Sequence, residues 1–157
     1  MRKVIFAVFT CLFLFSGLNI AGGEEALAPD FKLSDINGKN YSFSDYKGKQ
    51  PVILFFWTTW CPFCQDEIKK ISQKAVQLEK EGIKVLTIDL GESKDKVAYF
   101  AQKRGLSVTI LLDSTSMVGD YYEVGGVPTF FLINKEGRIV FQDNQFPEHY
   151  KELINRK

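Results

Sequence analysis

The stretch that decides the fold of this chain is VILFFWTTWCPFC, residues 52–64. Its first six residues are all apolar, as is typical of a strand that is covered on both faces of a sheet. An amphipathic stretch follows from Gln65 to about Glu81, with apolar residues at the 3.6-residue spacing of a helix. Gly82 ends it. The order is therefore strand, tight turn and helix, with Cys61 at the first turn of the helix.

The two cysteines of this stretch have the geometry of a reversible dithiol. A helix N-terminus carries unpaired backbone N–H groups and the positive end of the helix dipole, and both favour a thiolate over a thiol. Cys61 should therefore ionise more readily than a free cysteine. Cys64 lies one turn further along the helix, close enough to close a small disulfide ring with Cys61. The pair therefore indicates thiol–disulfide exchange.

A structural disulfide and a zinc site are the alternatives for this pair. A disulfide at this spacing closes a very small loop, so it constrains the unfolded chain much less than a long-range bridge would. Structural zinc needs four ligands, and Cys11 is the only other cysteine and His149 the only histidine. The sequence therefore favours redox chemistry, and it predicts neither a metal nor a cofactor.

Length and composition indicate one domain with a short extra segment. The chain has 157 residues, of which 45% are hydrophobic and 14 are Phe, so it can bury a core without further disulfides. The formal net charge is +1, and lysines and acids are mixed along the chain. Nothing in this pattern suggests a nucleic-acid partner.

Residues 1–23 have the pattern of an export signal. Two basic residues precede a largely apolar stretch, 4–18, and small and polar residues follow it. The uninterrupted apolar part is shorter than the about 20 residues that a membrane-spanning helix needs. Cys11 lies within it as a small apolar residue. Two alternatives stay open, cleavage after Gly23 and an uncleaved N-terminal membrane anchor, and both predict that the domain at 24–157 is exported.

The rest of the chain alternates between strand and helix signals. Because a helix joins the strand at 52–57 to the next one, these two strands should be parallel with a right-handed crossover. Asn37-Gly38 predicts a hairpin turn near the N-terminus. The sum is an α/β fold with a mixed sheet and helices on both faces. Further strands are expected at 28–33, 41–43, 83–88, 109–112, 127–133 and 138–141, and further helices at 93–104, 114–122 and 147–155, the last with Pro147 at its first position.

Four passages stand out in this chain: APDF (28–31) with the turn at 35–38, FWTTWC (56–61), LGES (90–93) and GVPT (126–129) ahead of FFLI (130–133). In this order they resemble the TlpA/ResA-like thiol–disulfide oxidoreductases of bacterial cell envelopes. The resemblance covers nearly all of the chain from Ala28 onward. It implies a thioredoxin-like fold, in which helices flank a central mixed β-sheet. It also implies an N-terminal β-hairpin extension and an inserted helix after the second strand of the βαβ unit.

The same resemblance assigns roles around the dithiol. Cys61 would be the attacking thiolate and Cys64 the resolving thiol. Pro128 matches a proline whose peptide bond is cis and which faces the dithiol. A cis bond there would expose the backbone of Val127 beside Cys61, where an extended substrate strand could pair with it.

Glu67 is the candidate for proton transfer. It follows Cys64 by three residues, so both side chains lie on one side of the helix. A carboxylate near the buried face could relay protons to or from Cys64. ResA-like proteins carry an acid at this position, which supports that role, and the alternative is a solvated helix glutamate.

Other side chains have expected places around the site. Trp60 should shape the pocket and Trp57 the core. Asp89, at the end of its strand, is a weaker candidate than Glu67 for proton transfer, and it is expected to serve instead at the surface or as a cap. His149 is expected at the surface of the last helix.

One dipeptide departs from the family pattern. Pro62-Phe63 stands between the cysteines, where this family commonly has an acid followed by a proline, and it is similar to glutaredoxin-like spacing. The dipeptide influences thiolate stability, so the direction of electron flow stays open. The expected substrate contacts and active-site supports are Trp60, Pro62, Phe63, Val127 and Pro128.

The resemblance implies an exported protein-disulfide reductase. It would act in the periplasm or at the extracytoplasmic face of the bacterial membrane, on proteins with disulfides such as apocytochrome c in cytochrome c maturation. A membrane thiol–disulfide electron donor would reduce it again. An exported dithiol oxidase or isomerase is the main alternative. A thiol peroxidase and a copper-delivery protein of the same fold are less well matched, since they need a different cysteine loop or a suitably placed histidine.

Overall fold

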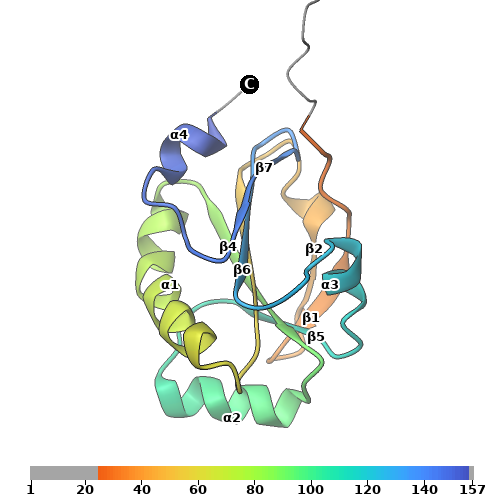
Figure 1. The fold of residues 1–157 in the computed structure, drawn as a ribbon, viewed down its shortest axis with the longest axis vertical. Helices are drawn as coiled ribbons and strands as arrows, with labels where there is room; N and C mark the ends of the chain where they lie inside the picture. The colour runs from red at the N-terminus through yellow and green to blue at the C-terminus, as the bar shows by residue number, and fades with distance from the viewer. Residues whose placement is uncertain (1–24, 156–157) are drawn as a thin grey trace, which may run out of the picture.

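A seven-stranded mixed sheet organises the protein in the computed structural model, which describes residues 25–155 (Figure 1). The strand order is β2-β1-β5-β4-β3-β6-β7. The expected leader at 1–23, with Cys11, lies outside the described residues. The strands are β1 (Lys32–Asp35), β2 (Asn40–Ser42), β3 (Val52–Trp57), β4 (Lys84–Leu90), β5 (Ile110–Asp113), β6 (Thr129–Ile133) and β7 (Ile139–Asp143). The helices are the 3-10 helix η1 (Phe43–Asp45), α1 (Pro62–Lys80), α2 (Lys94–Arg104), α3 (Met117–Tyr121) and α4 (Tyr150–Ile154).

The central strand is β3, and every one of its residues is buried. It pairs in parallel with β4 and antiparallel with β6, so both of its edges are hydrogen-bonded. Phe55 of β3 stacks on Phe130 of β6 with ring centroids 4.3 Å apart. The apolar run of the sequence therefore forms the middle of the sheet, as predicted.

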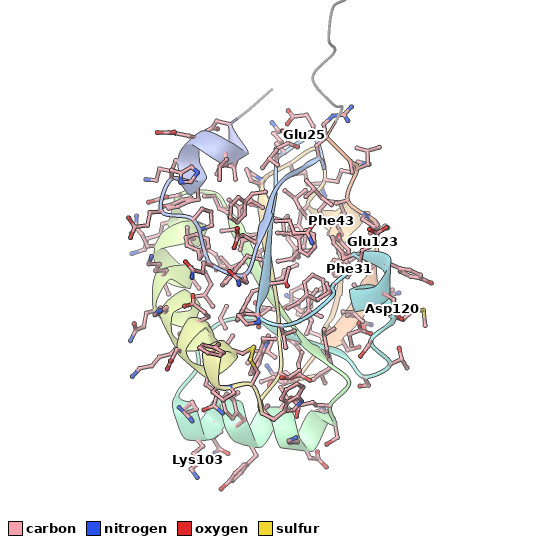
Figure 2. The ribbon with its side chains drawn as sticks, viewed as in Figure 1. Glu25, Phe31, Phe43, Lys103, Asp120 and Glu123 are labelled. Carbon is pink, nitrogen blue, oxygen red and sulfur yellow. A yellow bond between two sulfur atoms is a disulfide. The ribbon has the colours of Figure 1, made fainter. Side chains whose placement is uncertain are left out.

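Side chains of β3 alternate between two cores, one on each face of the sheet. Phe55 and Trp57 belong to the core that α1, α2 and α4 cover. Phe56 belongs to the core under α3 and the N-terminal hairpin. There Phe31 and Phe43 lie with ring centroids 6.4 Å apart (Figure 2). The expected mixed sheet with helices on both faces is confirmed.

Local sequence fixes both ends of α1. Pro62 occupies the first helical position, where its missing N–H is no loss, and Cys61 is the N-cap. After Lys80 the chain reverses through Gly82, whose φ of 79° favours glycine. The helix therefore starts at the end of the buried strand β3 and returns the chain to β4.

The N-terminal hairpin extends the sheet on the β5 side. β1 pairs antiparallel with both β2 and β5. Asp35 closes the hairpin turn, because its Oδ1 accepts hydrogen bonds from the backbone N–H groups of Asn37 and Lys39 at 2.8 and 2.9 Å. The hairpin extension is confirmed, and so is the inserted helix, which is α2.

The last helix is shorter than predicted. It begins at Tyr150 and not at Pro147. The preceding residues instead carry Phe146 against Phe130, with ring centroids 5.7 Å apart and the rings edge to face. This tertiary contact outweighs the preference of proline for a first helical position.

The helix expected at 114–122 is also shorter, since α3 begins at Met117. Asp113 explains this start, because its Oδ2 accepts hydrogen bonds from the N–H groups of Val118 and Gly119 at 2.9 and 3.0 Å. Residues 114 and 115 form the turn that brings this acceptor over the helix N-terminus. Across residues 25–155, none of the helices has the length and apolar character needed to span a membrane.

Candidate active site

Cys61 and Cys64 form a disulfide at the N-terminus of α1, with their Cα atoms 5.2 Å apart. The backbone N–H of Cys64 donates a hydrogen bond to Sγ of Cys61 at 3.2 Å. Cys61 keeps 5% of its surface exposed, whereas Cys64 has none. The geometry therefore offers Cys61 to an incoming partner and keeps Cys64 behind it.

The loop before β6 faces this dithiol. The peptide bond between Val127 and Pro128 is cis, as the resemblance implies. The carbonyl oxygen of Val127 lies 3.7 Å from Sγ of Cys61. Backbone that could pair with a bound peptide is therefore placed directly beside the sulfur expected to react.

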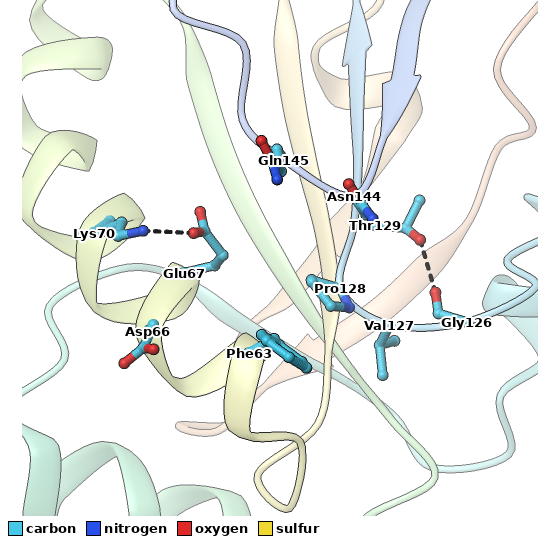
Figure 3. Close-up of a pocket in the computed structure, with 10 residues that line it drawn as sticks. All are labelled: Phe63, Asp66, Glu67, Lys70, Gly126, Val127, Pro128, Thr129, Asn144 and Gln145. Carbon is cyan, nitrogen blue, oxygen red and sulfur yellow. Dashed lines mark hydrogen bonds and ion pairs between the residues drawn. The ribbon is translucent and has the colours of Figure 1, made fainter.

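A cavity of about 600 Å³ lies between the start of α1 and this loop (Figure 3). Phe63, Glu67 and Lys70 line it from α1, and Val127 and Pro128 line it from the opposite side. The cavity is large enough to receive several side chains of a substrate, and one of its walls is the loop beside the dithiol.

The Glu67 carboxylate lies at this cavity and is paired with Lys70 (Figure 3). Its oxygen is 2.7 Å from Nζ of Lys70, and the Glu67 side chain is 19% exposed. Glu67 is therefore neither fully solvated nor fully buried. The structure places it on the helix face that carries Cys64, beside the path a substrate would take.

Two large apolar side chains stand out from the surface next to the dithiol. Trp60 is 65% exposed and Phe63 is 76% exposed. Phe63 lines the cavity, but Trp60 is not among its lining residues, so the expected role of Trp60 in shaping this pocket is not seen. Trp57 is fully buried in the core as expected, and His149 is exposed.

Glu92 ties the loop before Cys61 to the rest of the protein, a contact that the sequence did not reveal. Its carboxylate accepts hydrogen bonds from the backbone N–H of Thr59 at 2.5 Å and from the Thr59 hydroxyl at 2.8 Å. Lys96 pairs with the same carboxylate at 2.5 Å. Burial alone would raise the pKa of Glu92, but Lys96 and the Thr59 donors outweigh it and hold that pKa below its ordinary value. Glu92 therefore stays charged and anchors the loop.

The expectation that Asp89 serves at the surface or as a cap is wrong. Asp89 is fully buried, and neither of its carboxylate oxygens has a hydrogen-bond partner. It lies at the end of β4, in register with Trp57 of β3. Burial, followed by the nearby Glu92 carboxylate, raises the pKa of Asp89 to about 8. The sequence misled because the end of a strand is often exposed, whereas β4 is buried as far as Asp89.

Among residues 25–155, no group of three or more His, Cys, Asp or Glu side chains is arranged to hold a metal ion.

Comparison with known proteins places this site in a family. The AhpC/TSA family model matches residues 25–142. The thiol-disulfide oxidoreductase ResA of Geobacillus thermodenitrificans is 40% identical over 112 residues, which are 71% of this chain and 64% of that protein. ResA of Bacillus subtilis is 36% identical over 145 residues, which are 88% of this chain and 80% of that protein.

Solved structures agree with these relatives. A structure from Chlorobium tepidum, described as a thiol:disulfide interchange protein DsbE, is similar with a TM-score of 0.74 and 27% identity. The similarity covers 83% of this chain and 94% of that one. A thioredoxin structure from Neisseria meningitidis has a TM-score of 0.71 and 28% identity, and covers 83% and 89% of the two chains. The thioredoxin-like fold is confirmed.

Replacing Asp89 by Asn should stabilise the protein at neutral pH. The folded protein holds a proton on Asp89 up to about pH 8, whereas an ordinary aspartate loses it near 3.8. The free energy of unfolding of the wild type should therefore fall as the pH rises from about 4 to about 8. Asp89→Asn removes this pH-dependent loss of stability. At pH 7 the melting temperature of the variant should therefore be several degrees above that of the wild type.

Asp66→Asn is the matched control, because Asp66 is exposed on α1. Its melting temperature should follow that of the wild type at every pH. Identical pH profiles for Asp89→Asn and the wild type would show that Asp89 is not held protonated by burial.

Proposed function

Because the chain belongs to the ResA/TlpA-like thiol–disulfide oxidoreductases, a thioredoxin-fold group matched by the AhpC/TSA family model, we propose that it reduces disulfides in exported proteins. The observation that carries this proposal is the position of Cys61. Its sulfur caps α1 and accepts the N–H of Cys64, so a thiolate there gains both a hydrogen bond and the helix dipole. An activated thiolate beside a buried second cysteine is the arrangement that disulfide exchange requires.

The exchange proceeds in two steps. The Cys61 thiolate attacks one sulfur of the substrate disulfide, so a mixed disulfide forms and the other substrate sulfur leaves as a thiolate. Cys64 then loses its proton and attacks Sγ of Cys61, which closes the Cys61–Cys64 disulfide and releases the second substrate sulfur. Two electrons pass from the protein to the substrate. A donor dithiol must return them before the next cycle.

Glu67 is proposed as the base for the second step. Cys64 is fully buried, so its thiol needs a nearby acceptor for the proton that it gives up. Glu67 is on the same side of α1, one turn further along, and its carboxylate lies at the cavity beside the cis-proline loop. A substrate in that cavity would lie against the Glu67 carboxylate.

The cellular setting is part of the same proposal. The sequence pattern of residues 1–23 supports export to the periplasm or the extracytoplasmic face of the membrane, where an oxidising environment makes a membrane electron donor necessary. Apocytochrome c, whose haem-attachment cysteines must be reduced, is one proposed substrate class. This substrate rests on the family resemblance.

A Cys64→Ser variant should trap the substrate. Without the resolving thiol, the first step still occurs but the mixed disulfide on Cys61 is not released. Incubation of the reduced variant with a disulfide-containing protein should give a covalent adduct that dithiothreitol reverses, visible by non-reducing electrophoresis. Cys61→Ser is the control and should form no such adduct. An adduct through Cys64 in that control would reverse the assigned order of attack.

A Glu67→Gln variant should slow the second step by about tenfold, within the range that general-base catalysis contributes. The first step should stay within about twofold of the wild type, because Cys61 does not depend on Glu67. Stopped-flow measurement of mixed-disulfide formation and decay separates the two rates. Asp66→Asn, which removes a carboxylate from the same cavity, should leave both rates unchanged. Equal decay rates for Glu67→Gln and the wild type would remove Glu67 from the mechanism.

The redox potential decides the direction of electron flow. A reductase should equilibrate with glutathione at a potential close to that of thioredoxin, about −270 mV, and far from that of DsbA, about −120 mV. A potential near −120 mV would instead support the dithiol oxidase or isomerase.

Peroxide consumption tests the peroxidase alternative. The protein should consume hydrogen peroxide no faster than free cysteine does. Steady turnover of peroxide would support a peroxidase.

A further inference from the structure

A cationic groove lies on the flank of α1 opposite to the cavity of Figure 3. It is a hollow of about 320 Å³ between the loop before Cys61 and helix α2. Thr59 and Gln65 line one side of it, and Lys96, Lys103 and Arg104 line the other together with two aromatic rings of α2. An adjoining hollow of about 200 Å³ shares Gln65, Lys103 and Arg104 and adds Lys69. None of the residues lining these two hollows is acidic.

Existing contacts hold the cations of this groove in place. Arg104 donates a hydrogen bond to Oε1 of Gln65 at 2.5 Å, and its guanidinium carbon lies 5.2 Å from the centroid of the Phe100 ring. Nζ of Lys103 lies 5.9 Å from the centroid of the Tyr99 ring. A ligand would therefore lose less side-chain entropy on binding here than on freely moving lysines.

Lys103 and Arg104 form no ion pair among the residues that the structure describes. Glu92 pairs with Lys96, but for Lys103 and Arg104 the part of the chain from 25 to 155 provides no acidic partner within ion-pair distance. Lys103 lies at the outer side of α2 (Figure 2). The groove therefore presents a positive field to solvent, with Arg104 able to bind a carboxylate through two parallel hydrogen bonds.

The groove opens next to the dithiol. Thr59, on its wall, precedes Cys61 by two residues, and the exposed Trp60 stands between them. The cavity on the other flank of α1 contains Asp66 and Glu67 against Lys70 alone. A polypeptide that lies across the dithiol therefore meets opposite charge on its two sides.

We propose that this groove selects disulfide substrates that carry acidic residues beside the cysteine that Cys61 attacks. The inference rests on the proposed function and names the substrate class of the same site. Carboxylates of the bound segment lie against Lys103 and Arg104, and its apolar side chains contact the Tyr99 ring, which is 66% exposed. Charge complementarity of this kind acts mainly on the rate of productive encounter and is weakened by salt.

Three reporter peptides test this inference in single turnovers of the pre-reduced full chain. Each carries one disulfide between a fluorophore and a quencher, flanked by Glu, Gln or Lys residues. The second-order rate constant should be highest for the Glu peptide and about tenfold lower for the Lys peptide at low ionic strength. In the double variant Lys103→Glu and Arg104→Glu the order should reverse, with the Gln peptide within about twofold of the wild-type rate.

The matched control is the double variant Lys49→Glu and Lys135→Glu. It changes the net charge by the same amount, but both residues are exposed at the opposite end of the sheet from the dithiol. It should keep the wild-type preference. Equal rates for all three peptides, an equal loss for all three in the groove variant, or a reversed preference in the control would each overturn the inference. Failure of the wild type to reduce the Gln peptide would instead contradict the proposed function itself.

Discussion

The burial of β3 is the constraint on which the rest of the structure depends. All six residues of this strand are enclosed, and both of its edges are paired, so its C-terminal end is fixed in space. The loop that leaves this end is held again by Glu92, which accepts both the N–H and the hydroxyl of Thr59. Gln65 adds a hydrogen bond to the carbonyl oxygen of Thr59 at 2.9 Å. These contacts therefore hold Cys61 in a fixed position at the N-terminus of α1.

This support explains why a destabilising residue is tolerated close by. A buried carboxyl beside a second carboxylate, as Asp89 is beside Glu92, makes folding less favourable than a neutral side chain would. The stacked Phe55–Phe130 pair in the same sheet contributes in the opposite direction. Proteins commonly give up stability close to functional sites, and the end of β4 next to the Cys61 loop fits this pattern. The ion pair between Glu92 and Lys96 lies in the same region.

Much of the fold could be predicted because its signals are local. The apolar run at 52–57, the proline after Cys61 and the Asn-Gly turn each fix their own element. The spacing of Cys61 and Cys64 already predicted that they meet, but Pro128 could be placed beside them only through the family resemblance, since 66 residues separate Cys61 from Val127. Asp89 and Glu92 could not be placed, because their burial depends on how α2 covers the sheet. The start of α4 was predicted wrongly because it depends on a contact between distant parts of the chain, that of Phe146 with Phe130.

The reactivity of Cys61 with iodoacetamide as a function of pH tests the central claim most directly. The reduced protein should be alkylated at Cys61, with Cys64 remaining unmodified because it is buried. We expect the midpoint of the pH profile to lie well below that of a free cysteine, about 8.5, since the helix terminus and the Cys64 N–H stabilise the thiolate. A midpoint at or above 8.5 would contradict the account, because Cys61 would then lack the activation on which the exchange depends.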